Sequence, residues 1–148
     1  MSYIITNTQG AAFTFDQQKY MQFVTALRSP TPDIPFFLFD HALKDPSPSP
    51  SPVGLHHQVV IVEGLYTLLD QPGWREAADI MDMRIWIEVE REVARRRLVE
   101  RNFAAGISDT RQATEKRVDA SDMQNGEDVR RWRVEPTHIV TSIDEPRP

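Results

Sequence analysis

The chain has 148 residues, of which 40% are hydrophobic and 26% are charged, and its formal net charge is −5. That length suits one domain with a real core, and the acidic balance gives no general electrostatic reason to bind nucleic acid or an anionic membrane. No apolar run approaches the ~18 residues of a membrane span, and the start lacks a signal peptide's basic and apolar regions. The absence of cysteine excludes disulfides, thiolate catalysis and cysteine-based zinc sites, and it is typical of a reducing compartment, so we expect a cytoplasmic protein.

The first part of the chain predicts one helix and one extended segment. Residues 1–12 have no clear pattern and are expected to be irregular. From Asp16, at an N-cap position, apolar residues recur at helical spacing until Pro30 ends the helix. Residues 34–39 then predict an extended, largely buried segment that leads into Asp40 and His41.

Residues 44–54 are rich in serine and proline, which alternate from Ser47 to Pro52. We predict a polyproline-like loop that forms neither a helix nor a central strand. A proline-rich docking ligand is one interpretation, and a semi-rigid spacer is favoured at this length.

The apolar run Val59–Val62 predicts a strand that is buried on both faces, as in a parallel sheet with helices on each side. Glu63 follows at its carboxyl end, and Gly64 then allows a sharp turn. Ligands of open α/β sheets bind outside the carboxyl ends of the strands, which makes Glu63 a candidate site residue. A carboxylate that merely caps the turn is equally favoured.

The second half predicts further helices and strands. Residues 72–81 indicate a short helix, and in residues 83–89 the alternation of Met83, Ile85, Ile87 and Val89 opposite Trp86 indicates a strand. The segment from 90 to 105 favours a helix that stops at Gly106.

The remaining segment predicts a capped helix, a turn and a closing strand. Asp109 to Gln112 has the spacing of a capping box and opens a helix to about Ser121. Asn125–Gly126 is a turn signal, and residues 137–141 resemble a last strand. The whole order is a βαβ pattern, which predicts an α/β fold with a mainly parallel sheet.

An arginine-rich helix is the second candidate feature. Arg97 and Arg101 are four residues apart and share a helix face, so both guanidinium groups can contact one polyanion. The alternative is a solvated face on which Glu90, Glu92 and Glu100 pair with the arginines, and from the helix alone this alternative is favoured. His41 after Asp40 is either a substrate-contacting residue or a turn residue, and no metal-ligand spacing or catalytic triad stands out.

Four segments in this order resemble the P-loop small-molecule kinases of the uridine kinase, pantothenate kinase and phosphoribulokinase superfamily. They are Phe39-Asp-His-Ala-Leu-Lys-Asp-Pro46, Val60-Ile-Val-Glu-Gly-Leu-Tyr66, Arg97-Leu-Val-Glu-Arg101 with Gly106, and Val118-Asp-Ala-Ser-Asp-Met-Gln-Asn125. The resemblance covers roughly residues 11–143 and implies ATP- and Mg²⁺-dependent phosphorylation of a hydroxyl on a small metabolite such as a nucleoside, pantothenate or a sugar.

The resemblance also implies roles for individual residues. Glu63 would be the acid near Mg²⁺, and Asp40 and His41 would line the acceptor pocket. Arg97 and Arg101 would be lid arginines that neutralise the transferring phosphoryl group. Asp122 and Asn125 would lie in a loop near the adenine.

The chain departs from this family in its phosphate-binding motif and in the strand that follows it. Such kinases begin with a strand and Gly-x-x-x-x-Gly-Lys-Ser/Thr, and none of the six glycines here precedes a lysine. The strand that supplies the general base is also missing. The resemblance therefore implies an incomplete three-layer kinase-like α/β fold over 13–143, with the Ser/Pro loop 44–54 inside it, an irregular start (1–12) and a disordered tail (144–148).

Two hypotheses follow from this departure. The chain is either an N-terminally truncated form of a kinase that is inactive alone, or a non-catalytic protein that forms a homodimer or pairs with a partner through the exposed edge of Val59–Val62. An arginine-helix nucleic-acid module is disfavoured by the net charge.

Overall fold

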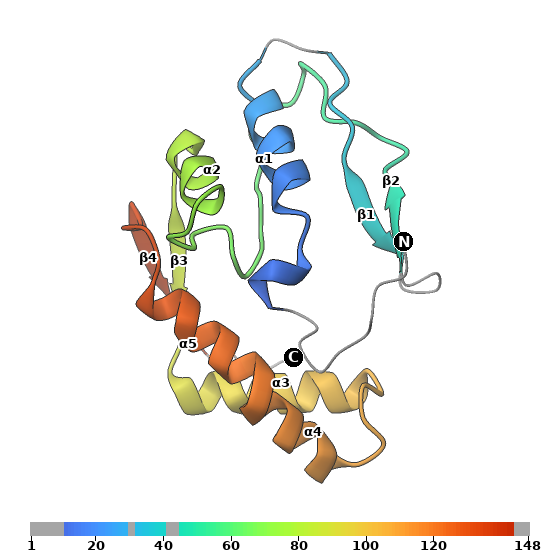
Figure 1. Ribbon diagram of the computed structural model, residues 1–148, viewed down its shortest axis with the longest axis vertical. Helices are drawn as coiled ribbons and strands as arrows, with labels where there is room; N and C mark the ends of the chain where they lie inside the picture. The colour runs from blue at the N-terminus through green and yellow to red at the C-terminus, as the bar shows by residue number, and fades with distance from the viewer. Residues whose placement is uncertain (1–10, 30–31, 41–44, 144–148) are drawn as a thin grey trace.

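The computed structural model describes residues 11–29, 32–40 and 45–143, and Figure 1 shows how the helices and strands are arranged. The helical elements are η1 (Ala12–Thr14), α1 (Gln17–Ala26), α2 (Trp74–Ile80), α3 (Arg91–Ala104), α4 (Arg111–Arg117), the π-helical turn η2 (Val118–Asp122) and α5 (Met123–Arg131). The strands are β1 (Phe37–Asp40), β2 (Asp45–Pro48), β3 (Ile85–Glu88) and β4 (His138–Thr141). The fold is α/β, and its described strands form an antiparallel pair, β1–β2, and a parallel pair, β3–β4.

The antiparallel pair includes part of the Ser/Pro-rich segment. The predicted polyproline-like loop is wrong for residues 45–48, which pair with β1 so that Phe37 lies opposite Pro48. The amide of Ser49 donates to the carbonyl of Phe36 at 2.8 Å, so Pro48 occupies the adjacent, non-hydrogen-bonded position of the ladder. A residue in that position needs no N–H directed at the partner strand, and alternate prolines are therefore compatible with this edge strand.

The parallel pair confirms the predicted βαβ unit. Ile87 lies opposite Val140, and the crossover between the strands contains α3, α4, η2 and α5. In Figure 1, α3 begins where β3 ends, and α4 and α5 return across α3 toward β4. The sheet expected from the sequence is wider than this two-stranded pair.

The two faces of β3 are separated as the alternation predicts, and the structure covers the face that carries Trp86. Trp86 is half-buried and packs against the core. Ile85 and Ile87 lie on the opposite face and are 47% and 55% exposed, and their neighbour Val140 is 49% exposed. The apolar face of this sheet is therefore open in the described part of the chain.

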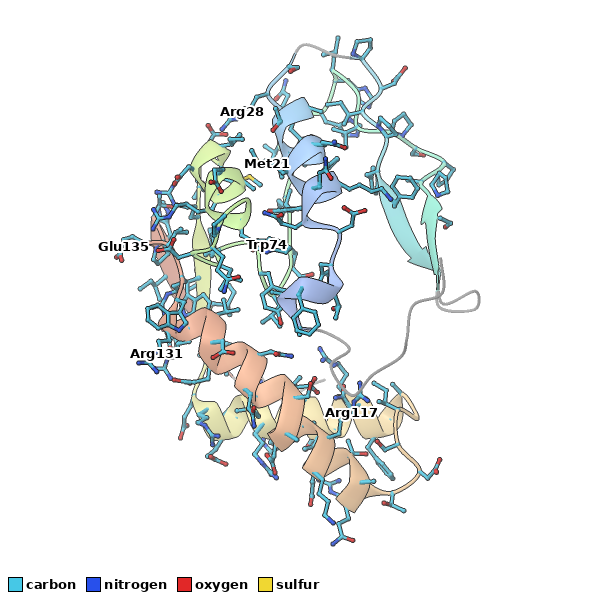
Figure 2. The ribbon with its side chains drawn as sticks, viewed as in Figure 1. Met21, Arg28, Trp74, Arg117, Arg131 and Glu135 are labelled. Carbon is cyan, nitrogen blue, oxygen red and sulfur yellow. The ribbon has the colours of Figure 1, made fainter. Side chains whose placement is uncertain are left out.

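The core consists of two small apolar clusters. One contains Tyr66, Leu69, Trp74 and Val129, and the other contains Leu68, Ala78 and Val134. Trp86 packs against both clusters. The rings of Tyr20 and Trp74 lie 5.1 Å apart and join α1 to α2. Figure 2 shows Trp74 at the start of α2. The segment that follows Gly64 thus supplies much of the buried surface.

The Val59–Val62 segment departs furthest from prediction. We expected a strand buried on both faces, but the segment pairs with no strand of the described residues. The side chains of Val59 and Ile61 are 78% and 88% exposed. A parallel strand becomes buried only when neighbours pair with its edges and helices cover its faces, and within the described ranges this segment has no such neighbours.

The helix after Thr110 is longer than the sequence predicts. It runs through α4, η2 and α5 without a break, so the predicted end near Ser121 and the predicted turn at Asn125–Gly126 are both wrong. Val118 and Val129 are fully buried and attach both parts of this helix to the protein. Burial of this kind overrides the local turn preference of asparagine and glycine.

Three helix ends show how local sequence fixes the elements. The carboxylate of Asp16 accepts the backbone N–H three residues on at 3.0 Å, and Gly106 adopts φ 66°, which confirms the predicted cap of α1 and stop of α3. At α4 the cap is Thr110, whose hydroxyl accepts the amide of Ala113 at 3.1 Å, and not the predicted Asp109. None of the described helices is both long and apolar enough to cross a bilayer.

Candidate functional site

Glu63 lies at the end of the Val59–Val62 segment, and its side chain is exposed. The chain then turns because the amide and hydroxyl of Thr67 both donate to the carbonyl of Gly64, at 3.4 and 3.0 Å. Among the described residues, no group of three or more histidine, aspartate or glutamate side chains is arranged to hold a metal. Glu63 would therefore be one carboxylate ligand and not part of a metal cluster. One or two carboxylates are the usual protein ligands of Mg²⁺ where substrate phosphates also bind the ion.

Arg97 contacts the end of β4. Its Nη1 donates to Ser142 Oγ at 2.7 Å and its Nη2 donates to the carbonyl of Ile143 at 3.2 Å. Arg101 is exposed, and its Nε lies 3.5 Å from Asn102 Oδ1. The two predicted lid arginines share α3, and two nitrogens of the Arg97 guanidinium already donate to residues at the end of β4.

The other arginines of α3 form ion pairs. Arg91 lies 3.2 Å from Glu92 and Arg96 lies 4.0 Å from Glu100, as the alternative of a solvated face predicts. These pairs are exposed and contribute little to stability.

Arg95 makes the best-formed ion pair of the helix. Its Nε and Nη2 donate to the two carboxylate oxygens of Asp119 in η2, at 2.6 and 2.7 Å. This hydrogen bonding, together with the charges of Arg95 and Arg91, lowers the pKa of the Asp119 carboxyl. The pair fixes η2 against α3.

Asp122 has a different environment from the predicted one. We expected Asp122 and Asn125 in a loop near the adenine, but both lie in the long helix, at the end of η2 and in α5. Asp122 Oδ2 accepts a hydrogen bond from Asn102 Nδ2 at 2.8 Å, and Asn102 is only 4% exposed. The structure thus gives Asp122 a role in holding α3 against the long helix.

The predicted acceptor residues are described only in part. Asp40 is the last residue of β1, and of it only the backbone is described. His41 lies outside the described residues. The adjacent His56 and His57 stack with ring centroids 4.0 Å apart, and the Nδ1 of His57 accepts the amide of Gly54.

One candidate residue escaped the sequence analysis. Arg117 lies at the end of α4 (Figure 2), and its Nε is shielded from solvent without a hydrogen-bond partner in the described part of the chain. A shielded guanidinium nitrogen of this kind is suited to an anion. No local motif marks it, because its burial depends on how α4 packs.

Comparison with known proteins decides the family. The sequence model of the Phosphoribulokinase / Uridine kinase family matches residues 4–125 of the chain. The chain belongs to this family. The resemblance drawn from the four segments is therefore confirmed.

Named relatives of this family member include a fungal protein and two solved structures. ATP-dependent kinase-like protein notR' of Aspergillus versicolor is 38% identical over 138 residues, which are 89% of this chain and 79% of that protein. A Silicibacter sp. TM1040 structure, named for a fructose transport system kinase, superposes with a TM-score of 0.83 at 29% identity, over 92% of this chain and 65% of that one. YFH7 of Saccharomyces cerevisiae, named as a P-loop containing kinase with a circular permutation, superposes with a TM-score of 0.76 at 26% identity, over 93% and 50%. The chain thus spans about half to two thirds of the solved kinases that it matches.

Proposed function

We propose that this chain provides the acceptor and lid parts of an ATP-dependent kinase that phosphorylates a hydroxyl of a small metabolite, and that the chain alone does not catalyse the reaction. One observation carries the second part: the family member contains no Gly-x-x-x-x-Gly-Lys-Ser/Thr segment in its 148 residues. Backbone N–H groups and the lysine of that segment hold the β- and γ-phosphates in P-loop enzymes.

The proposal gives the remaining residues roles that phosphoryl transfer requires. Glu63 would contribute its carboxylate to Mg²⁺, which supplies positive charge against the nucleotide phosphates when bound. Arg97 and Arg101 would supply positive charge near the transferring group, and Asp40 and His41 would contact the acceptor. Phosphoryl transfer depends on positioning and charge, so these groups contribute little without the phosphate cradle.

Two of the candidate residues already have hydrogen-bond partners within the chain. Arg97 is bonded to the end of β4, and Asp122 is bonded to the buried Asn102. Asp122 is therefore assigned to the helix interface, and Arg117 is added as a candidate phosphate contact because its Nε has no hydrogen-bond partner in the described part of the chain.

A calorimetric titration of the folded chain with Mg-ATP tests the proposal. We expect no binding heat from protein whose circular dichroism shows the helices in place, because the phosphates have no cradle. The same titration is made on Arg97→Ala/Arg101→Ala and on the control Arg91→Ala/Arg111→Ala, which removes equal charge from exposed ion pairs. Micromolar binding that weakens only in the first variant would show that a nucleotide site works without a P-loop, and the proposal would be wrong.

A non-catalytic, self-associating protein is the second candidate function. It is favoured by the exposure of Val59 and Ile61 in a segment without a strand partner in the described residues. Two antiparallel copies of one segment can pair about a twofold axis, so such an edge is complementary to itself.

A further inference from the structure

The Ser/Pro-rich segment has no part in the proposed kinase chemistry. It contains three consecutive Ser-Pro dipeptides, at Ser47, Ser49 and Ser51. These dipeptides have the same local chemistry, but the fold places their three hydroxyl groups in different environments. A continuous polyproline ligand does not explain the segment, because residues 45–48 are paired in β2.

The first two serines are held by the hairpin. Ser47 is half-buried in β2, opposite Leu38. Ser49 donates its amide to the carbonyl of Phe36 at 2.8 Å. The hydroxyl of Ser49 donates to the carbonyl of Ser51 at 3.1 Å and accepts the amide of Ser51 at 3.2 Å. A modifying enzyme that binds the backbone around either serine must therefore displace the pairing with β1 or with Phe36.

Ser51 lies on a bulge that the strand register creates. Phe36 bonds to Ser49, and Ile34 next forms a bridge with Val53. One residue of the first strand, Pro35, is therefore opposed by the three residues 50–52, which project from the ladder. Neither proline of the bulge has an N–H to pair.

The hydroxyl of Ser51 is free within the described structure. Ser51 is exposed, and its Oγ makes no hydrogen bond with any described residue, although its amide and carbonyl contact Ser49. Pro52 follows it and presents no N–H to an enzyme that binds the residue after the serine. Ser51 thus combines an accessible nucleophile with a following proline.

We propose that Ser51 is a phosphorylation site for a proline-directed Ser/Thr protein kinase, and that it is selected over Ser47 and Ser49 by the bulge. The oxygen of Ser51 forms a bond to the γ-phosphorus of ATP, the bond from that phosphorus to the β,γ-bridging oxygen breaks, and ADP leaves. The hydroxyl proton passes to the catalytic carboxylate of the protein kinase. The product carries about two added negative charges on the bulge.

Site-resolved mass spectrometry of the folded full chain, incubated with a cyclin-dependent protein kinase and Mg-ATP, tests this proposal. We expect phosphate at Ser51 at least about tenfold faster than at Ser47 or Ser49, because those sites require local opening of paired backbone. Ser51→Ala should remove most of the incorporation, Pro52→Ala should lower it similarly, and Ser47→Ala should leave it unchanged.

The urea-denatured chain, diluted into the assay and labelled before it refolds, provides the reference for intrinsic sequence preference. We expect the preference for Ser51 to shrink in this sample, since the three dipeptides then differ little. Equal labelling of all three serines in the folded chain, or labelling of Ser47 or Ser49 ahead of Ser51, would overturn the proposal. Absence of label at Ser51 in the folded chain, with label in the denatured one, would overturn it as well.

Discussion

The buried amide of Asn102 helps to connect α3 with the long helix of the crossover. Asn102 is 4% exposed on α3 and donates to Asp122 Oδ2 at 2.8 Å in η2. The residues lie 20 positions apart. A buried polar side chain costs free energy unless it is hydrogen-bonded, so this contact specifies how α3 meets the long helix.

Replacement of this amide should therefore destabilise the protein. We expect Asn102→Ala to lower the free energy of unfolding by about 1–3 kcal/mol, because Asp122 loses its partner in a shielded place. Urea denaturation followed by circular dichroism measures the change. Asp122→Asn keeps an acceptor oxygen and should cost less than about 1 kcal/mol. Equal losses in the two variants would contradict this role of the hydrogen bond.

The sequence predicted local contacts of single residues better than distant ones. The cap at Asp16 was confirmed, since it depends on a backbone N–H three residues away. The pairs Arg95–Asp119 and Asn102–Asp122 were not predicted, because the two residues of each pair lie in separate helical elements, 24 and 20 positions apart in the sequence. The lid role of Arg97 and Arg101 stays a prediction.

At the scale of elements, the N-cap of α4 lies one residue later than the sequence predicted. The sequence placed a capping box at Asp109, and the structure places the cap at Thr110, whose hydroxyl accepts the amide of Ala113 at 3.1 Å. Both residue types are good caps, so the local pattern does not distinguish them.

Two substitutions separate these alternatives. We expect Thr110→Ala to lower the free energy of unfolding by about 1 kcal/mol, since the first turn of α4 loses its cap. Asp109→Ala is the matched control and should change stability by less than about 0.5 kcal/mol. Thermal unfolding of both variants measures the difference. A larger loss in Asp109→Ala would instead support the register that the sequence predicted.

The type of β3 was predicted correctly from the sequence, but its environment was not predicted. The alternation in residues 83–89 gave a strand with Trp86 opposite the isoleucines, and this is what β3 shows. Periodicity separates two faces but does not say which one is covered. The core clusters select Trp86, and Ile85 and Ile87 stay exposed.

On the scale of the whole molecule, two stretches expose several apolar side chains each: the unpaired Val59–Val62 segment and the β3–β4 face. Val59 and Ile61 are 78% and 88% exposed, and Ile87 and Val140 on the β3–β4 face are about half exposed. Contiguous apolar surface and unpaired strand edges commonly mark association sites.

We therefore expect the chain to self-associate through the Val59–Val62 segment. Sedimentation velocity from about 1 to 100 µM should show a concentration-dependent dimer, the range in which modest interfaces form. Ile61→Lys should weaken association at least about tenfold, because a charge enters the paired edge. Gln112→Lys, an exposed control on α4, should not. A monomer at every concentration would contradict the second candidate function.

The alternate prolines of β2 have a consequence for the growth of the antiparallel sheet. Pro46 and Pro48 lie opposite Phe39 and Phe37, at positions whose backbone groups point away from β1. A third strand that paired with the outer edge of β2 would find carbonyl oxygens there but no amide hydrogens. The hairpin is thus closed to further strands on this side, while the Val59–Val62 stretch keeps its amides. Fibrillar stacking of this protein should accordingly avoid the outer edge of β2, and residues 59–62 are a stretch at which it can start.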